Sequence, residues 1–298
     1  MLKDFTELME KVSSGRQYTV CVAAAQDGEL LHAVKLAVDM GFMRPILVGN
    51  EKIVTDLAAE VGLTEFEVVP CDDVDECAAV AVEVVKSGRA DVLMKGVIST
   101  ATYMRAILNR ETGLRNGSLI SALAVYELKE YHKLVYCSDS GINTAPDADQ
   151  KQAILTNALG AMHRLGLDCP NVAALAASET VHPKIQASVD ADMLVKLAEQ
   201  GELPRCVIEG PIAFDVAFDR HAAEHKGIES AISGEVDLIL APNIETGNAL
   251  GKSWLTLSHA KWAGVVLGTT HPVVLGSRSD TAEVKINSIA LACLLAQS

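Results

Sequence analysis

Positive charge and aromatic side chains are both scarce in this chain. Its 298 residues include 25 lysines and arginines against 39 aspartates and glutamates, which gives a formal net charge of −14. Aromatic residues make up only 4% of the sequence. The absence of a broad positive field argues against general binding to nucleic acids or acidic membranes. An anionic ligand would need positive charge supplied locally by a few lysines or arginines.

Paired cysteines and long apolar runs are also missing. The seven cysteines are scattered and form no CxxC pair, which disfavours a disulfide framework or a zinc site and indicates a reducing compartment. No apolar stretch approaches the roughly 18 residues of a membrane span. The amphipathic N-terminal segment does not have the layout of a secretory signal. We therefore expect a cytoplasmic protein with no membrane or nucleic-acid partner.

Familiar nucleotide and metal motifs are absent or incomplete. No GxGxxG turn follows the first predicted strand, which disfavours a Rossmann nicotinamide site. Residues 246–253 (TGNALGKS) resemble a P-loop, but three residues separate the two glycines where a P-loop has four. His221 and His225 fit an HxxEH zinc pattern that is also common on solvated helices. The sequence thus favours neither nucleotide binding nor zinc hydrolysis.

Short β-branched runs alternate with helical patterns along the whole chain. Strands are predicted at 18–24, 45–48, 66–69, 92–94, 134–137, 172–175, 207–209, 238–240, 265–267 and 273–275. Helices are predicted at 30–40, 52–61, 74–86, 100–108, 119–128, 150–165 and 282–295. This alternation predicts an α/β fold with a mainly parallel sheet.

The length of the chain predicts two domains at roughly 150 residues each. We place the boundary at residues 130–132, between the predicted helix 119–128 and the strand that follows it. The last helix is expected to return to the first lobe, because two α/β lobes often exchange terminal segments. The predicted first lobe is then 1–131 plus 272–298, and the second lobe is 132–271.

Polar and basic side chains follow several predicted strands. Loops at the carboxyl ends of strands line the ligand crevice of an open α/β sheet. Lys95, Lys252 and Arg278 lie in or just after three such loops, and Arg105 lies in the helix after Lys95. Taken singly, each loop is also explained by turn and capping chemistry. Together these residues supply the local positive charge that an anionic ligand would need.

The segment before the last predicted helix carries both a helix-capping pattern and a basic residue suited to an anion. Asp280 and Glu283 have the spacing of an acidic N-cap and its partner three residues later. Arg278 precedes the predicted helix start, where free N–H groups and the helix dipole favour an anion. A guanidinium group matches phosphate oxygens in pairs. We expect Arg278 to bind phosphate.

Seven segments together resemble the phosphate acetyl/butyryltransferase family. They are residues 95–105, SDSGINTAPD from Ser138, SETVHPKI from Ser178, IEGPIAFDVAFD from Ile208, AAEHKGI from Ala222, APNIETGN from Ala241 and GSRSDTAEVKINSIALA from Gly276. The resemblance covers nearly the whole chain. It implies two α/β lobes of mainly parallel sheets similar to the isocitrate and isopropylmalate dehydrogenase fold, with the active site in the interlobe cleft.

The resemblance also implies the chemistry. Members of the family move an acyl group reversibly from coenzyme A to inorganic phosphate, which gives an acyl phosphate. Butyryl is implied here by the resemblance alone, and acetyl, propionyl and branched acyl groups stay open. No metal or separate cofactor is implied, since the coenzyme A thioester is a substrate. A homo-oligomer and functional coupling to an acyl (butyrate) kinase are implied as well.

The resemblance assigns roles to individual residues. Ser277-Arg278 matches the Ser-Arg pair of the last cleft loop, and Arg105 matches an arginine at the start of a cleft helix. The implied catalytic residues are Ser277, Arg278, Arg105 and Glu283. The implied substrate-binding residues are Lys95, Ser138, Asp139, Asn143, Asn248, Lys252 and Asp280. In this assignment phosphate lies between the two arginines, and Ser277 donates to the oxyanion.

One position departs from the family pattern. Acetyltransferase members carry an acidic residue seven positions after the serine, proposed to deprotonate the coenzyme A thiol, and this chain has Val284 there. The general base is then Glu283, Asp280 or a residue elsewhere.

The sequence leaves three other interpretations of the protein's function and chemistry open. A metal- and NAD-dependent dehydrogenase of the same fold would need ligands such as Asp139, His182, His221 and His271. A non-catalytic acyl-CoA-binding module is favoured by Val284 alone. Cys137, beside the predicted site, is a candidate nucleophile.

Overall fold

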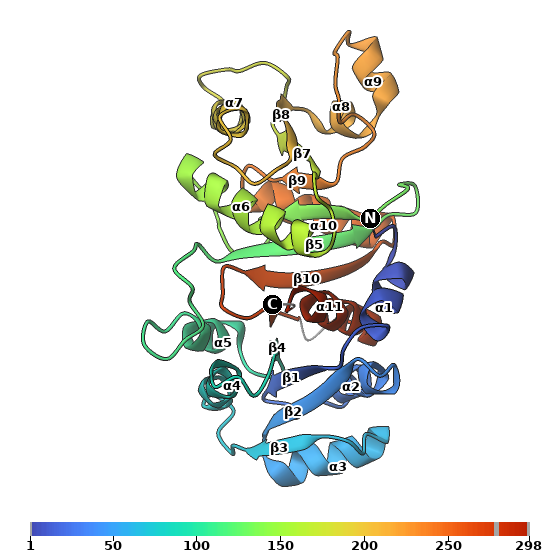
Figure 1. Ribbon diagram of the computed structural model, residues 1–298, viewed down its shortest axis with the longest axis vertical. Coiled ribbons are helices and arrows are strands. Elements are labelled where there is room, and N and C mark those ends of the chain that lie inside the picture. Colours follow the sequence, from blue (N-terminus) through green and yellow to red (C-terminus); the bar gives the residue numbers. More distant parts are fainter. Residues whose placement is uncertain (1, 277–279, 297–298) are drawn as a thin grey trace. The chain divides into compact units, whose positions relative to one another are not determined.

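The chain forms two compact units. A computed structural model describes residues 2–276 and 280–296. The first unit comprises Phe5–Ser118 and Trp262–Ser298, and the second comprises Met1–Asp4 and Leu119–Lys261. Each unit contains several strands and helices (Figure 1).

The paired strands of the first unit are parallel except for one. Its strands lie in the order β3 (Glu67–Pro70), β2 (Met43–Gly49), β1 (Tyr18–Ala23), β4 (Val92–Lys95), β11 (Val273–Val274) and β10 (Lys261–Leu267). Only β10 runs antiparallel to its neighbour β11. The central strands β1 and β4 are buried almost throughout, as expected for a parallel sheet covered on both faces.

Helices cover both faces of that sheet. They are α1 (Phe5–Ser13), α2 (Gly28–Asp39), α3 (Glu51–Val61), α4 (Cys77–Lys86), α5 (Thr100–Ile107) and α11 (Ala282–Leu295). Figure 1 shows α2 and α3 on one face and α4 on the other. The chain therefore reverses its winding direction between β1 and β4, which pair directly. Ligands of open α/β sheets bind at the carboxyl ends of strands at such a switch point.

The second unit repeats this design with other helices. Its strands lie in the order β5 (Ser121–Glu127), β6 (Val135–Ser138), β9 (Leu238–Leu240), β7 (Asn171–Leu175) and β8 (Val207–Ile212). Only β5 is antiparallel to its neighbour, β6. The helices are α6 (Ala148–Arg164), α7 (Gln186–Glu199), α8 (Phe214–Phe218), α9 (Arg220–His225) and α10 (Ile244–Leu257). The predicted α/β class with mainly parallel strands is confirmed.

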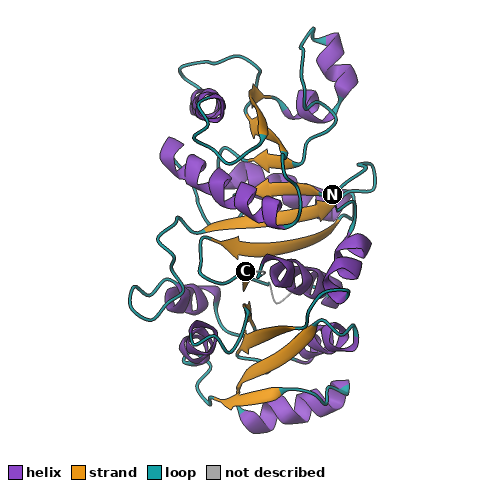
Figure 2. Cartoon of the chain, in the orientation of Figure 1, coloured by secondary structure: helices purple, strands orange, loops and turns teal. Residues whose placement is uncertain are grey.

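The predicted helix 119–128 is wrong, because Ser121–Glu127 forms strand β5 (Figure 2). Its residues pair with β6 through Ala124 and Cys137, and through Tyr126 and Val135. Alanine and leucine favour a helix locally, but pairing with a neighbouring strand overrides that preference. Since β5 joins β6, the second unit begins at Leu119 and not at residue 132.

The other predicted boundary differs for a similar reason. Strand β10 pairs with β11, so residues from Trp262 onward belong to the first unit, whereas the sequence placed this boundary at residue 272. Helix α11 lies in the first unit. Within the described ranges, no helix has both the length and the apolarity to cross a membrane.

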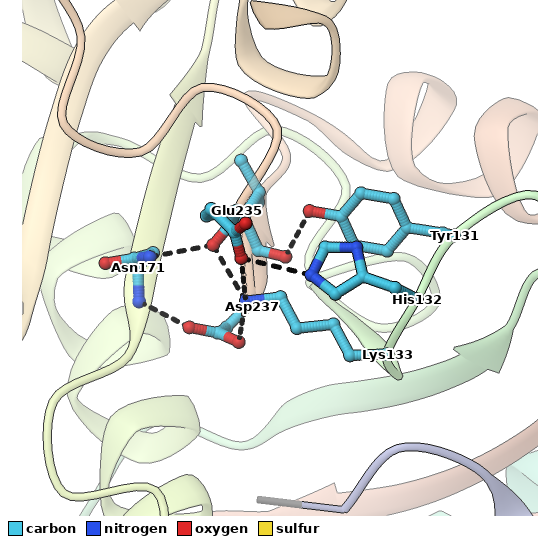
Figure 3. A network of polar contacts seen from close by, with 7 residues as sticks. Tyr131, His132, Lys133, Asn171, Glu235 and Asp237 are labelled. Atoms are coloured by element: carbon cyan, nitrogen blue, oxygen red, sulfur yellow. Dashed lines mark hydrogen bonds and ion pairs between the residues drawn. The ribbon is translucent and has the colours of Figure 1, made fainter.

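A buried polar network ties together the amino ends of β6, β7 and β9 (Figure 3). Lys133 Nζ donates to Asp237 Oδ1 at 2.7 Å and to the carbonyl oxygen of Glu235 at 2.9 Å. The backbone N–H of Asn171 donates to Asp237 Oδ2 at 2.8 Å. The network lies at the amino ends of these strands, whereas Ser138 and Ala241 lie at the carboxyl ends.

Candidate active site

The described candidate residues are divided between the two units. The first unit holds Lys95, Arg105, Asp280 and Glu283, and the second holds Ser138, Asp139, Asn143, Asn248 and Lys252. Ser277 and Arg278 lie outside the described residues.

The carboxylate of Asp139 organises the loop after β6. It accepts five hydrogen bonds, from the backbone N–H groups of Ala122, Gly141, Ile142 and Asn143 and from Asn143 Nδ2, at 2.6–3.3 Å. Asp139 is only 2% exposed. A carboxylate has about four lone-pair sites, so these donors occupy it fully. Asp139 therefore shapes the loop and does not offer a free oxygen to a ligand.

Two neighbours of Asp139 fix the same loop. Ser138 is fully buried, and its Oγ donates to the carbonyl oxygen of Ala122 at 2.8 Å. Asn143 Nδ2 also donates to the carbonyl oxygen of Ile120 at 2.9 Å. The loop after β6 is thereby joined to the start of β5. Ser138 and Asn143, which the resemblance placed among the substrate-binding residues, make these internal contacts.

The start of α10 packs directly on this loop. Asn243 caps the helix, since its Oδ1 accepts from the Thr246 N–H at 2.9 Å. Asn248 Nδ2 donates to the carbonyl oxygen of Ser140 at 3.4 Å. A Cβ added at Gly247 would lie 2.9 Å from the carbonyl oxygen of Asp139, so only glycine permits this approach.

The segment that resembles a P-loop is the body of this helix. Residues 246–253 lie within α10, and Gly251 packs against the hydroxyl of Tyr126. The two glycines therefore serve helix packing. Lys252 is exposed on the same helix and forms no ion pair with the described residues. Its charge is available to an anionic ligand.

In the first unit, the end of β4 carries Lys95. Lys95 ends β4 and is 6% exposed, and its Nζ lies 3.4 Å and 3.5 Å from the carbonyl oxygens of Gly96 and Gly276. Gly96 is pressed against the carbonyl oxygens of Ala23 and Ala24, and it has no room for a Cβ. The loop that carries Lys95 is therefore held tightly to the end of β1.

Arg105 is exposed in the last turn of α5, and not at the start of a helix as the resemblance implied. The helix begins after Ser99, whose Oγ accepts from the Thr102 N–H at 3.1 Å. An exposed guanidinium group near a helix end can bind an oxyanion in two-point geometry.

Thr281 caps α11, so the predicted capping role of Asp280 is wrong. The Oγ1 atom of Thr281 accepts from the Val284 N–H at 3.4 Å, and Asp280 lies one residue before the cap. Thr281 stands directly before the first residue of α11, one position closer to the helix than Asp280. Its hydroxyl therefore takes the capping role that the sequence assigned to the Asp280 carboxylate. Glu283 is exposed in the first turn of α11.

Sequence reasoning missed Lys285. This lysine lies in the first turn of α11, is only 7% exposed, and donates from Nζ to the carbonyl oxygen of Asp280. It lines a small cavity of about 20 Å³ together with Asp27, Lys95 and Gly276. A single lysine in a helical segment normally indicates a solvated face, so the sequence offered no signal for it.

The structure gives little support to a metal-dependent dehydrogenase or to Cys137 as a nucleophile. Among the described residues, no group of three or more His, Cys, Asp or Glu side chains is arranged to hold a metal ion. Asp139 is occupied by backbone donors, and His221 stacks on His225 with ring centroids 6.4 Å apart. Burial raises the pKa of Cys137 to about 12, which disfavours the thiolate that a nucleophile needs.

Comparison with known proteins identifies relatives over the full length. The family described as "Phosphate acetyl/butaryl transferase" matches residues 72–293. A phosphate butyryltransferase of Clostridium acetobutylicum is 41% identical over 298 residues, covering 99% of this chain and 99% of that protein.

Solved structures agree with this relationship. A branched-chain phosphotransacylase from Enterococcus faecalis V583 has a TM-score of 0.84 and 32% identity, covering 94% of this chain and 99% of that one. A 4-hydroxythreonine-4-phosphate dehydrogenase from Klebsiella pneumoniae has a TM-score of 0.57 at 12% identity, covering 94% of this chain and all of that one, and shares the fold alone. The predicted likeness to a dehydrogenase fold is confirmed. The chain is a transferase enzyme and belongs to the phosphate acetyl/butyryltransferase family.

Proposed function

We propose that this enzyme transfers a butyryl group reversibly between coenzyme A and inorganic phosphate. The observation that carries the proposal is the 41% identity to a phosphate butyryltransferase along 99% of both chains. The exposed Arg105 and Lys252 supply positive charge in a chain whose net charge is −14. A similar branched-chain phosphotransacylase makes other short acyl groups the alternative substrates.

The chemistry of the step assigns roles to the first-unit residues. Arg278 and Arg105 hold phosphate, whose oxygen attacks the thioester carbonyl carbon. Ser277 and nearby N–H groups donate to the oxyanion, which collapses and breaks the carbon–sulfur bond. The products are acyl phosphate and the coenzyme A thiolate, a fair leaving group with a pKa near 8.5. In reverse, Glu283 or Asp280 takes the thiol proton.

The remaining candidate residues bind coenzyme A or support the site. Lys252 contacts phosphate groups of coenzyme A, and Lys95 supports the phosphate side of the site. Ser138, Asp139, Asn143 and Asn248 hold the loop after β6 in place. No metal or separate cofactor takes part in the proposed step.

We include the cellular setting in the proposal. All seven cysteines lie among the described residues and are free, which agrees with a reducing, cytoplasmic compartment. The enzyme acts as a homo-oligomer. Its acyl phosphate is an activated phosphoryl donor, so an acyl kinase would consume or supply it.

Release of free thiol from butyryl-CoA, with and without phosphate, tests the function. We expect phosphate-dependent release that falls at least 100-fold in Arg278→Ala and stays at the wild-type rate in Arg44→Ala. Arg44 is a matched control because it is exposed near the amino end of β2. Release that is independent of phosphate would indicate a thioesterase. Tight acyl-CoA binding without thiol release would indicate a binding module.

A further inference from the structure

A buried ion pair joins helices α6 and α7 of the second unit. Lys151 Nζ lies 2.5 Å from Asp190 Oδ2, and the two side chains are 6% and 3% exposed. Asp190 Oδ1 also accepts a hydrogen bond from Gln186 Nε2 at 2.7 Å. Both carboxylate oxygens of Asp190 therefore have fixed partners, and the ammonium group of Lys151 is held by one of them.

This pair lies near the carboxyl ends of the strands, whereas Lys133 and Asp237 pair at the amino ends. Lys151 lines a small cavity of about 10 Å³ together with Leu175, at the end of β7, and Ala241, just after β9. Loops at the carboxyl ends of strands bind the ligands of open α/β sheets. The pair is therefore on the side of these strands that carries the candidate site residues of the second unit.

Lys151 belongs to the first turn of α6, where the loop after β6 ends. Its backbone N–H donates to the carbonyl oxygen of Asp147, the N-cap of this helix, at 2.9 Å. The same loop is bonded to the start of α10, since the Ile244 N–H donates to the carbonyl oxygen of Thr144 at 3.0 Å. A shift of α6 would therefore move this loop and the start of the helix that carries Lys252.

Asp190 lies near the start of α7, which follows the loop after β7. Ser188 ties that loop to the helix, because its Oγ accepts from the His182 N–H at 2.9 Å and is fully buried. Strands β6 and β7 lie on either side of β9, and α10 follows β9. The ion pair thus connects the loops that flank the start of α10.

The surroundings of the pair are apolar. Apart from Lys151, the residues that line the cavity are alanines, leucines and one proline. Well-packed apolar side chains often stabilise such a position as well as a buried ion pair does, or better. A charge-assisted hydrogen bond, in contrast, favours one relative placement of the two helices. Placement of the loops therefore explains the pair better than stability alone.

We propose that Lys151 and Asp190 are positioning residues of the acyl-transfer site, whose ion pair holds the loops after β6 and β7 in place for coenzyme A. This inference rests on the proposed function, in which Lys252 of α10 contacts phosphate groups of coenzyme A. Loops that are already in place lose less conformational freedom when the coenzyme binds. Inorganic phosphate is assigned to the first unit, so the pair should act on the coenzyme alone.

Replacing both charges with neutral groups tests the proposal. In the double variant Lys151→Met/Asp190→Asn, the asparagine oxygen still accepts from Gln186. We expect the KM for butyryl-CoA to rise about tenfold, while kcat and the KM for phosphate stay within about twofold of the wild type. Lys151→Arg retains a charged donor and should keep the KM for butyryl-CoA within about threefold.

The pair at the amino ends supplies a matched control. The double variant Lys133→Met/Asp237→Asn removes an ion pair of the same chemistry and similar burial from the same unit. Both double variants should melt below the wild type, but the control should keep both KM values within about twofold. An equal rise in the KM for butyryl-CoA in both would trace the effect to lost stability and would overturn the positioning role.

A milder variant covers the case in which the neutral pair does not fold. Asp190→Asn alone keeps an acceptor for the buried ammonium group of Lys151 and should raise the KM for butyryl-CoA about threefold. Calorimetric titration with coenzyme A gives a readout that does not depend on turnover, and its Kd should rise by the same factor. An unchanged KM and Kd in the folded variant would overturn the positioning role.

The two proposals fail in different ways. A wild-type enzyme that binds coenzyme A but releases no thiol with phosphate would contradict the proposed function, and the titration would still decide whether the pair positions the loops. An active wild type whose Lys151→Met/Asp190→Asn variant keeps its KM for butyryl-CoA and its Kd for coenzyme A would contradict the positioning role alone.

Discussion

Lys133 and Asp237 form a buried ion pair, with Nζ 2.7 Å from Oδ1 and side chains that are 4% and 3% exposed. They precede β6 and β9, the strands whose other ends carry the loop of Asp139 and the start of α10. The same strands thus have a stabilising network at one end and candidate site residues at the other. Stability and activity should respond separately to substitutions at the two ends.

Lys133→Met should lower the free energy of unfolding by about 3 kcal/mol, because it leaves the Asp237 charge buried without its partner. Urea unfolding measures this loss. The folded variant should keep its kcat within about twofold. Lys196→Met, which breaks an exposed pair with Asp192, should change stability by less than about 0.5 kcal/mol. A loss below about 1 kcal/mol in Lys133→Met would contradict the buried-pair interpretation.

Asp139→Asn should impair both the loop and the reaction. The amide keeps one acceptor oxygen and turns donors toward the N–H groups of Gly141 or Asn143. We expect a loss of about 1–3 kcal/mol in unfolding free energy and at least a tenfold drop in kcat/KM. Asp168→Asn, at an exposed position, is the matched control. If Asp139→Asn retained wild-type kinetics, the loop would not need this carboxylate.

Lys252→Ala should raise the KM for butyryl-CoA about tenfold without changing the melting temperature, because the side chain is exposed and forms no ion pair with the described residues. The difference from the wild type should shrink in 0.5 M salt, where charge attraction is screened. Lys129→Ala, also at an exposed position, should leave the KM unchanged. A KM insensitive to both salt and Lys252 would place the coenzyme elsewhere.

Cys137→Ala should keep kcat within about twofold of the wild type. Burial raises the pKa of Cys137 to about 12, so almost no thiolate is present at pH 8. In a thiol-labelling time course, the exposed Cys169 should react well before Cys137. A 100-fold loss of kcat in Cys137→Ala would instead support a covalent acyl-enzyme.

His271 should make stability depend on pH below neutrality. Its burial lowers its pKa from the usual 6.5, although Asp91 partly opposes this. The unfolded chain then binds the proton more readily, so the contribution of His271 is fully present above pH 6.5 and is lost as the pH falls toward the lowered value. Between pH 7 and 5.5, His271→Gln should show a shallower decline in unfolding free energy than the wild type. The exposed His32→Gln is the control, and identical slopes in all three proteins would refute the effect.

The local sequence pattern predicted most elements but not every partner. The strand 238–240 and the helix 282–295 match β9 and α11 residue for residue. Residues 121–127 were misread because their composition is helical and their pairing partner, β6, is supplied by another part of the chain. Helix α10 was not predicted for the same reason. Gly247 and Gly251 are typical of loops by sequence, and only the structure shows that they allow close packing within a helix.

The sequence by itself determined the α/β class, the family and the residue types gathered at the strand ends. These follow from periodicity and local motifs, which each segment carries within itself. Only the tertiary structure decided which charged groups face inward: Asp139 is enclosed by the N–H groups of distant Ala122 and its own loop, and Lys285 by the carbonyl oxygen of Asp280. Whether a polar side chain serves the backbone or a ligand depends on what the fold places within hydrogen-bond distance, and spacing along the chain does not record that.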